Sequence, residues 1–314
     1  MTSDNNPDFQ SIVTKCHVYC RNDAFAASLG KLREVMLGLS LDTYGHTAPS
    51  RNPKSFNSAV PGHSPKRGYI IGYTPRSGST FLAESLNNLT TRRLAYFGYP
   101  GEVLNLSTLP ARALHYGCRS LDDYAHWALW ESTDESGLFS IKCDLFQLLP
   151  FLFLPVFQAL MRDIKFVYLA RDDVMLQAIS FVRAIHSGLW ASASNDVVSK
   201  NSIYDLDEIA DYVRLLTDMM AGWENVFAFS GIKPLRLTYE QVERDLLGCV
   251  RKIADYVNIS LPSGELNDIR SDLRILRDDR NYQTRLEAIE RFGITSAVPT
   301  VQRLNRSIGS RSGQ

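Results

Sequence analysis

The 314-residue sequence is poor in cysteine and has no excess of charge of either sign. Its five cysteines, an odd number, are scattered along the chain as Cys16, Cys20, Cys118, Cys143 and Cys249. A small secreted domain that is stabilised by disulfides usually has an even number of closely spaced cysteines. We therefore expect a reducing, cytoplasmic location. Lys plus Arg and Asp plus Glu both number 34, which predicts no general attraction to nucleic acid or to an anionic membrane. Any anion-binding site must therefore be local.

The sequence also lacks an apolar run of membrane-spanning length. One unusually apolar run, LFQLLPFLFLPVFQALM, covers residues 145–161 and contains Gln147, Pro150 and Pro155. A membrane span needs about 20 apolar residues, so this run predicts a buried helix, with the wall of a pocket for an apolar ligand as the alternative. The first ten residues have no basic stretch followed by an apolar core, and we expect no signal peptide.

The first 66 residues differ from the rest of the chain and predict an N-terminal extension. Asn22 can cap a short amphipathic helix whose apolar face is formed by Phe25, Leu29, Leu32 and Met36. Residues 43–66 are rich in Pro, Ser, Gly and Asn, which is typical of a flexible linker. We therefore expect an extension over residues 1–66 and a single α/β domain over residues 67–314.

From residue 67 onward, short apolar runs alternate with stretches of helical periodicity. Strands are expected at residues 69–73, 94–97, 138–141, 165–170 and 235–238. Helices are expected between the first strand and residue 87, at 121–131, 172–190 and 206–229, and from the last strand to residue 257. This alternation predicts an α/β fold with a P-loop-type, mostly parallel sheet and helices on both faces. The small and polar residues 190–205 predict a mobile loop.

The sharpest local feature is a loop between the first strand and its helix, Thr74-Pro75-Arg76-Ser77-Gly78-Ser79-Thr80. Small residues let backbone N–H groups approach an anion, and the following helix adds the positive end of its dipole. The hydroxyl groups and the Arg76 guanidinium supply further donors. The loop therefore predicts an anion site, with an ordinary strand-to-helix turn capped by serine as the alternative.

This loop lacks the lysine of a Walker A motif. That motif places Lys-Ser or Lys-Thr after its second glycine, where the lysine reaches the terminal phosphates and the hydroxyl binds magnesium. Here Ser79 follows Gly78. We therefore expect no metal and an anion that needs less charge compensation than a triphosphate, such as a phosphosulfate.

A second polar group follows the strand expected at residues 165–170. Arg171 comes at the carboxyl end of this strand, where ligands bind in open α/β sheets, and Ser180 lies on the next helix. An arginine and a hydroxyl placed in this way can hold one phosphate from two sides, as a nucleotide 3′-phosphate requires. In the alternative interpretations, Arg171 pairs with a surface carboxylate, and Asp172 or Asp173 caps the helix. A Walker B role of Asp172 is disfavoured because the Walker A lysine is missing.

At these residues the chain resembles the bacterial carbohydrate sulfotransferases of the trehalose 2-sulfotransferase type, which use 3′-phosphoadenosine-5′-phosphosulfate (PAPS). Three segments carry the resemblance in the same order: TPRSGSTFLAE at 74–84, GYPGEVLN at 98–105 and YLARDDVMLQAISFVRAIHSGLW at 168–190. The third is the most specific, because its pattern extends over a whole helix. The resemblance implies that the 5′-phosphosulfate is held by Arg76, Ser77, Gly78, Ser79 and Thr80. It also implies that the 3′-phosphate is held by Arg171 and Ser180.

The resemblance also assigns residues to the acceptor side. Glu102 matches the carboxylate proposed as general base, with a solvent-exposed loop glutamate as the alternative. Pro75 and Tyr99 stand where trehalose-type enzymes have polar residues for sugar hydroxyls, which argues against trehalose itself as the acceptor. Lys142, just after a predicted strand, is a weaker candidate for contact with the substrate, with a role as ion-pair partner as the alternative.

Together these features predict a sulfotransferase that moves a sulfuryl group from PAPS to a hydroxyl of a small carbohydrate-like acceptor and releases adenosine 3′,5′-bisphosphate (PAP). The rival interpretations are a kinase-like P-loop phosphotransferase that uses ATP and magnesium, and a nucleotide-binding protein without activity. Enzymes of this type are often dimers, so a homodimer is an expectation without an assigned interface. We expect no nucleic-acid partner and no membrane span.

Overall fold

The computed structural model describes residues 7–40, 65–190, 204–262 and 279–293. Its contacts divide the chain into two compact units. The first, here called the sheet unit, comprises residues 1–172 and 218–271, and the second, the helical unit, comprises residues 173–217 and 272–314. Most of the predicted linker and most of the predicted mobile loop lie outside the described residues. The predicted division of the chain at residue 66 stays a prediction.

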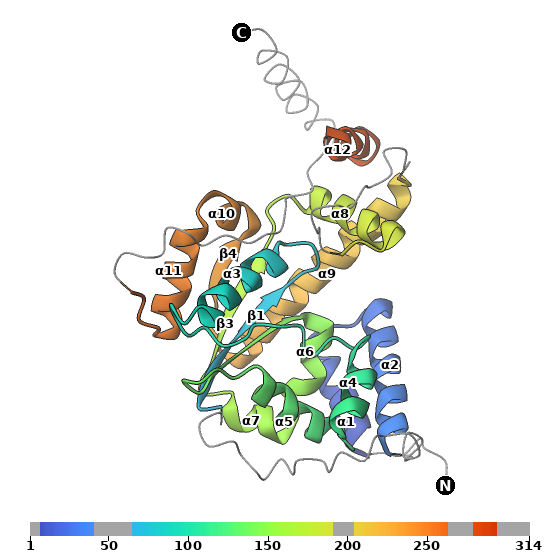
Figure 1. Cartoon of the computed structure of the whole chain (residues 1–314). Helices are drawn as coiled ribbons and strands as arrows, with labels where there is room; N and C mark the ends of the chain where they lie inside the picture. The colour runs from blue at the N-terminus through green and yellow to red at the C-terminus, as the bar shows by residue number, and fades with distance from the viewer. Residues whose placement is uncertain (1–6, 41–64, 191–203, 263–278, 294–314) are drawn as a thin grey trace. The chain divides into compact units, whose positions relative to one another are not determined.

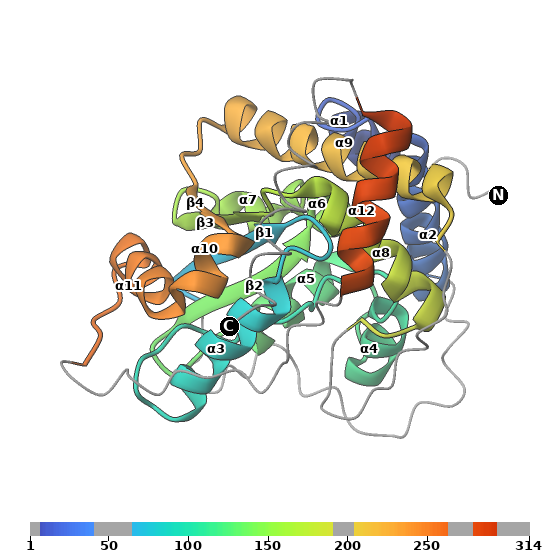
Figure 2. The same ribbon diagram turned by 90° about the horizontal axis from the view of Figure 1, so that it is seen from above.

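The sheet unit is built on four parallel strands in the order β2-β1-β3-β4 (Figure 1 and Figure 2). Their bounds are β1 Arg67–Tyr73, β2 Leu138–Asp144, β3 Ile164–Ala170 and β4 Leu235–Thr238. The register pairs Tyr73 with both Asp144 and Leu169, and Ala170 with Thr238, so the carboxyl ends of all four strands lie along one edge. Central parallel strands are covered on both faces, which explains why six of the seven residues of β1 are buried. The predicted α/β fold with a parallel sheet is confirmed.

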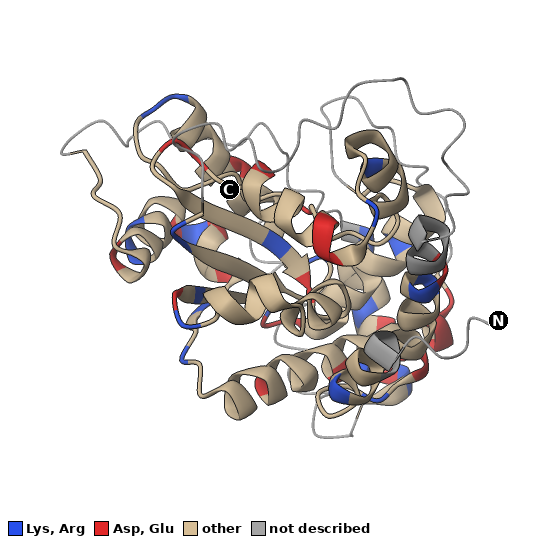
Figure 3. Cartoon of the chain, turned by 90° about the horizontal axis from the view of Figure 1, so that it is seen from below, with Lys and Arg blue, Asp and Glu red and all other residues tan. Residues whose placement is uncertain are grey.

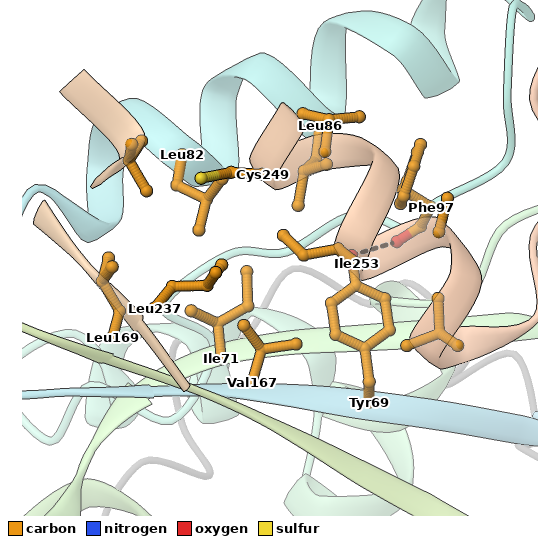
Figure 4. Packing of buried hydrophobic residues seen from close by; sticks show 14 of the residues in the cluster. Tyr69, Ile71, Leu82, Leu86, Phe97, Val167, Leu169, Leu237, Cys249 and Ile253 are labelled. Carbon is orange, nitrogen blue, oxygen red and sulfur yellow. Dashed lines mark hydrogen bonds between the residues drawn. The ribbon is translucent and has the colours of Figure 1, made fainter. Parts of the chain in front are cut away.

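One face of the sheet is covered by three helices, α3 (Ser79–Thr91), α10 (Tyr239–Arg244) and α11 (Leu246–Val257). Alternate residues of a strand point to the same face, so Tyr69 and Ile71 of β1 both enter this layer. They pack in one buried cluster with Val167, Leu237 and Ile253 (Figure 4). The Tyr69 hydroxyl is not left unpaired there, because it donates a 2.8 Å hydrogen bond to the carbonyl of Phe97.

The opposite face is organised around Trp223 of α9 (Leu206–Ser230). Its indole Nε1 donates to the Tyr73 carbonyl at 3.1 Å, and its ring contacts the rings of Phe166 and Tyr168. Glycine is required at position 72 of β1, because a Cβ atom there would lie 2.6 Å from Trp223 Cη2. Two further helices, α5 (Leu121–Glu131) and α6 (Leu145–Leu152), pack against β2. Helices therefore cover both faces, as predicted.

The apolar run at residues 145–161 forms two short helices. The Asp144 carboxylate caps α6 by accepting a 2.9 Å hydrogen bond from the Gln147 N–H. Pro155 begins α7 (Pro155–Leu160), as expected for a residue that fits the first turn of a helix but has no N–H group. Most of the run is buried, so the predicted buried helix is confirmed, but it is broken before Pro155. None of the described helices combines the length and apolarity needed to cross a bilayer.

The N-terminal segment packs on this layer as two helices, α1 (Pro7–Cys16) and α2 (Asp23–Ser40). Asn22 Oδ1 accepts a 2.8 Å hydrogen bond from the N–H of Phe25, which confirms the predicted cap. Phe25, Leu29 and Leu32 are buried, and the ring of Phe25 contacts that of Phe146 in α6. Helix α4 (Leu109–Tyr116) also contacts α2.

The helical unit contains α8 (Val174–Ser187), the first part of α9 and α12 (Asp279–Phe292), which lies beside α8 (Figure 2). Its buried apolar cluster is small and consists of Leu176, Ala178, Ile179, Val182, Ile209 and Leu216. Asp173 caps α8, because its Oδ1 accepts a 2.9 Å hydrogen bond from the Leu176 N–H. Its Oδ2 forms an ion pair with Arg285 Nε of α12 at 2.7 Å. The predicted capping role of Asp173 is confirmed.

Two predictions of secondary structure were wrong. Residues 94–97 form no strand, because the backbone here is held by side chains: the Phe97 N–H donates to Thr90 Oγ1 and the Gly98 N–H donates to Asp134 Oδ2. The helix expected from the last strand to residue 257 is divided into α10 and α11 at Asp245, whose carboxylate caps α11 through the Gly248 N–H at 2.8 Å.

Candidate active site

The candidate site lies along the carboxyl edge of the parallel sheet, where open α/β sheets bind ligands (Figure 1). The loop Thr74–Thr80 follows β1, and residues 171–172 follow β3. Tyr239 and Glu240 begin α10 directly after β4. The topology alone therefore brings together three segments that are far apart in the sequence.

The loop after β1 has the backbone of an anion cradle. Arg76 and Gly78 both have positive φ angles, 67° and 79°, and Gly78 is the N-cap residue of α3 without a side-chain hydrogen bond to the helix. The first N–H groups of α3 are thus left to a ligand at the positive end of the helix dipole. Glycine is required at position 78 for a second reason, because a Cβ atom there would lie 2.5 Å from the Tyr239 ring.

Ser77 is the clearest sign that this loop binds something polar. Its side chain is fully buried, and its Oγ atom has no hydrogen-bond partner among the described residues. A buried hydroxyl without a partner costs about 1–3 kcal/mol, so such groups in folded proteins usually serve a ligand, an ion or an ordered water. An anion in the loop would supply the missing acceptor.

Arg171 is aimed at the same loop from the end of β3. Its Nη1 donates to the carbonyl of Arg76 at 3.5 Å, and its guanidinium lies 4.8 Å from the centroid of the Tyr239 ring. Glu240 lies 3.9 Å from Arg171 Nε and accepts a 3.1 Å hydrogen bond from the Asp172 N–H. The side chain of Arg171 is only 10% exposed, so these contacts hold a buried cation against the loop.

The candidate base Glu102 belongs to a dense polar cluster beside this loop. Lys142 Nζ lies 2.7 Å from Glu102 Oε1, and the Tyr73 hydroxyl donates to the same oxygen at 2.9 Å. Asn105 Nδ2 donates to Glu102 Oε2 at 3.1 Å. Lys142 Nζ also donates to Thr80 Oγ1 at 3.0 Å, which connects the cluster directly to the anion loop.

The electrostatic environment of Glu102 keeps it ionised. Burial raises the pKa of its carboxyl, but the charge and hydrogen bond of Lys142, with the hydrogen bonds from Asn105 and Tyr73, outweigh burial and leave the pKa below its ordinary value. The pKa of the nearby Asp144 is shifted in the opposite direction. Burial, with a smaller contribution from the charge of Glu102, raises this pKa to about 6. Glu102 is therefore a carboxylate at neutral pH and able to accept a proton.

The backbone around Glu102 is held by the surrounding elements. Arg112 of α4 donates to the Glu102 carbonyl at 3.0 Å, and the Tyr124 hydroxyl of α5 donates to the Val103 carbonyl at 2.6 Å. The Lys142 N–H donates to the Gly101 carbonyl at 3.0 Å, which ties the loop to β2. The direction of the carboxylate is thus set before any substrate binds.

The structure brings most of the predicted residues together. Arg76, Ser77, Gly78, Ser79, Thr80, Arg171, Glu102 and Lys142 all belong to the sheet unit and to the segments just described. Pro75 lies in the loop, half-buried, and the Tyr99 side chain is 40% exposed two residues before Gly101. Ser180 lies on α8 in the helical unit, so its pairing with Arg171 stays a prediction.

Sequence reasoning missed three residues of the site, Tyr73, Asn105 and Tyr239. Tyr73 carried a usable signal, because it is the last residue of the predicted strand and directly precedes the loop. Asn105 lies three residues after Glu102, at the end of a segment that carries the resemblance. Tyr239 carried no local signal, since its role depends on the approach of β4 to β3. Among the described residues, no three His, Cys, Asp or Glu side chains cluster as a metal site would require.

Charged residues elsewhere are interspersed. Figure 3 shows that Lys and Arg (blue) and Asp and Glu (red) are both scattered over the described part of the chain. Some of these charges form ion pairs on the surface, such as Arg236–Glu224 and Arg93–Glu135. The cation-lined loop is thus a local feature of a chain whose total charge is balanced.

Comparison with known proteins finds similarity to sulfotransferases over part of the chain. Residues 152–292, just under half of the chain, match the family model of the Stf0 sulphotransferases. A trehalose 2-sulfotransferase of Mycobacterium tuberculosis is 31% identical over 105 residues, which cover 32% of this chain and 39% of that protein. A trehalose 2-sulfotransferase of Mycolicibacterium smegmatis is 26% identical over 93 residues, 30% of this chain and 35% of that protein. The similarity thus spans less than two fifths of the length of these relatives. It confirms the predicted resemblance, since residues 152–292 of this chain are similar to the Stf0 sulphotransferases.

Proposed function

We propose that this protein transfers a sulfuryl group from PAPS to a hydroxyl of a small carbohydrate-like acceptor, with Glu102 as the general base. The observation that carries the proposal is that the anion loop and the Glu102 carboxylate lie side by side at one edge of the sheet. An anion loop with a buried, unsatisfied Ser77 hydroxyl lies beside an ionised carboxylate, and Lys142 contacts both. The similarity to Stf0 sulphotransferases supports the same reaction class.

The residues of the loop suit a phosphosulfate. The positive φ angles of Arg76 and Gly78, the uncapped start of α3 and the hydroxyl of Ser77 offer donors to an oxyanion. Arg171 places a guanidinium at the loop backbone. In this proposal Arg76–Thr80 hold the 5′-phosphosulfate, and Arg171 with Ser180 holds the 3′-phosphate.

The chain's own residues then have separate tasks. When bound, PAPS supplies the sulfuryl group, and the phosphate of PAP is the leaving group. Glu102 accepts the proton of the acceptor hydroxyl as the hydroxyl oxygen attacks sulfur in line with the leaving oxygen. Loop N–H groups, Arg76 and Lys142 stabilise the negative charge that develops on the leaving side. Tyr73 and Asn105 keep the carboxylate oriented.

The acceptor side points to a carbohydrate-like hydroxyl compound. The exposed ring of Tyr99 precedes the Glu102 segment and offers a flat apolar face, on which a sugar ring can stack. Pro75 brings a second apolar surface from the anion loop. A cytoplasmic location and a homodimer remain part of the proposal as expectations from the sequence.

Calorimetry with PAP and with ATP, each with magnesium and with a chelator, tests the proposal. Micromolar, magnesium-independent binding of PAP together with weak binding of ATP supports it. Preference for magnesium-ATP would replace it with a kinase-like phosphotransferase. Tight PAP binding without turnover of PAPS on any mono- or disaccharide tested would favour a nucleotide-binding protein without activity.

A further inference from the structure

Lys142 lies between the anion loop and the candidate base and contacts both. Its Nζ atom is 2.7 Å from Glu102 Oε1 and 3.0 Å from Thr80 Oγ1. The side chain is only 6% exposed, so its charge is weakly screened by water and acts strongly on nearby groups. Tyr73 lies under it, with the ring centroid 5.3 Å from Nζ. Such an ammonium responds to a change of charge at either contact.

Two anionic groups compete for this ammonium once the loop is filled. Without an anion in the loop, the loop contact of Lys142 is the neutral hydroxyl of Thr80, and Glu102 is the carboxylate that pairs with it. An anion at the start of α3 adds negative charge beside Thr80, the second contact of the ammonium. Lys142 then stabilises the Glu102 carboxylate less strongly, because one positive charge is shared between two negative partners.

We propose that Lys142 divides its charge between the anion loop and Glu102, so that filling the loop weakens the Lys142–Glu102 ion pair and makes Glu102 a stronger base. This inference rests on the proposed function and describes the regulation of the same site. The acceptor proton passes to Glu102, the hydroxyl oxygen forms the bond to sulfur, and the sulfur–oxygen bond to the 5′-phosphate breaks with its electron pair left on PAP. The base becomes effective when the donor site is occupied.

The groups around Glu102 favour this behaviour. Burial acts to raise the pKa of Glu102, and Lys142 is the largest influence in the opposite direction. The other ionisable or charged groups that bear on this carboxylate are Tyr73 from β1, Cys143 and Asp144 from β2, and Arg112 from α4, which binds the Glu102 carbonyl. Withdrawal of part of the Lys142 charge therefore leaves burial dominant, and the pKa of Glu102 rises.

A double-mutant cycle on PAP affinity tests the inference. Glu102→Gln releases Lys142 to the loop, and we expect PAP to bind about 3- to 10-fold more tightly; Lys142→Met should weaken PAP binding about tenfold. In the Lys142→Met background, Glu102→Gln should give no gain, because the shared cation is gone. All four proteins are compared by calorimetry at one pH and salt concentration.

Proton uptake on binding gives a second readout that a purely structural role would not move. At about pH 5, measured in two buffers of different ionisation enthalpy, PAP binding should take up more protons in the unchanged chain than in Glu102→Gln. This excess should vanish in Lys142→Met. If Lys142→Met lowers the unfolding midpoint, Lys142→Gln removes the same charge but keeps a polar side chain and allows the same cycle.

The outcomes separate the inference from the proposed function. An equal gain from Glu102→Gln with and without Lys142 would show simple repulsion of the anion by the carboxylate and would overturn the inference. No gain in the presence of Lys142 would also overturn it. Failure of the unchanged chain to bind PAP would refute the proposed function, and the inference with it.

Discussion

The anion loop (residues 74–80) and the Glu102 loop (residues 98–105) lie at the same edge of the sheet but are built in different ways. The anion loop owes its shape to backbone conformation, with positive φ at Arg76 and Gly78 and an uncapped helix start. The Glu102 loop is held by side chains of other elements, including Arg112 and Tyr124. The difference follows from what each loop presents. The shape of the first loop depends on its own backbone angles, whereas a loop that aims a side chain can bond its own carbonyls to the scaffold.

The largest expected effect comes from removing the proton acceptor while both loops keep their structure. Glu102→Gln keeps the shape of the side chain but removes the proton acceptor, so turnover of PAPS in the presence of saccharide acceptors should fall about 10²- to 10⁴-fold. Tyr73→Phe is the matched control, since it removes one hydrogen bond to the carboxylate but keeps the base, and should cost about tenfold or less. Near-normal turnover of Glu102→Gln would remove Glu102 from its role.

The next effect comes from a substitution that disturbs the backbone conformation of the anion loop. Gly78→Ala places a side chain at φ 79° and brings its Cβ atom within 2.5 Å of the Tyr239 ring. We expect PAP affinity to fall more than about tenfold and the free energy of unfolding to fall by about 1–3 kcal/mol. Gly231→Ala is the control, because φ there is 65° but nothing lies within 4 Å of the added Cβ. Equal effects of the two variants on PAP affinity would contradict the collision with Tyr239.

The third prediction concerns the guanidinium that lies against the anion loop and leaves the loop backbone unchanged. Arg171→Ala should weaken PAP binding about 10- to 150-fold, which corresponds to about 1.5–3 kcal/mol of charged hydrogen bonding. Isothermal calorimetry measures it directly. Arg93→Ala serves as the control, since Arg93 is 70% exposed and pairs with Glu135 on the surface. Unchanged affinity in Arg171→Ala would refute the assignment of Arg171 to the donor.

The smallest expected effect is a pH-dependent change in stability that arises from Asp144, beside Glu102. Burial raises the pKa of Asp144 to about 6 from an ordinary value of 3.8, so the folded state favours its protonated form. The stability that this proton supplies is complete below about pH 4 and is lost as the pH rises through about 6. Asp144→Asn keeps an oxygen for the Gln147 N–H and has no charge to bury. It should therefore stabilise the protein by about 1–3 kcal/mol at pH 7.5 and by much less at pH 4.5. Urea unfolding at both pH values checks this, and an equal change at both would exclude a charge effect.

Predictions from local sequence were correct where the deciding interactions are local. The loop at residues 74–80 follows an apolar strand and precedes a helix, so its place at the sheet edge follows from order along the chain. The cap at Asp173 is likewise a contact with a residue three positions away. The strand predicted at residues 94–97 was wrong because distant Asp134 and the preceding helix supply the hydrogen bonds that a neighbouring strand would otherwise make.

The sequence by itself determined the alternation of strands and helices, the anion loop without a Walker lysine and the family resemblance. These depend on periodicity, on glycine and serine at fixed offsets, and on the order of short segments. Only the tertiary structure decided that Lys142 bridges Thr80 and Glu102 and that Tyr239 packs against Gly78. The physical reason is the parallel sheet, whose register brings residues of different strands to one edge at distances that spacing in the sequence does not contain.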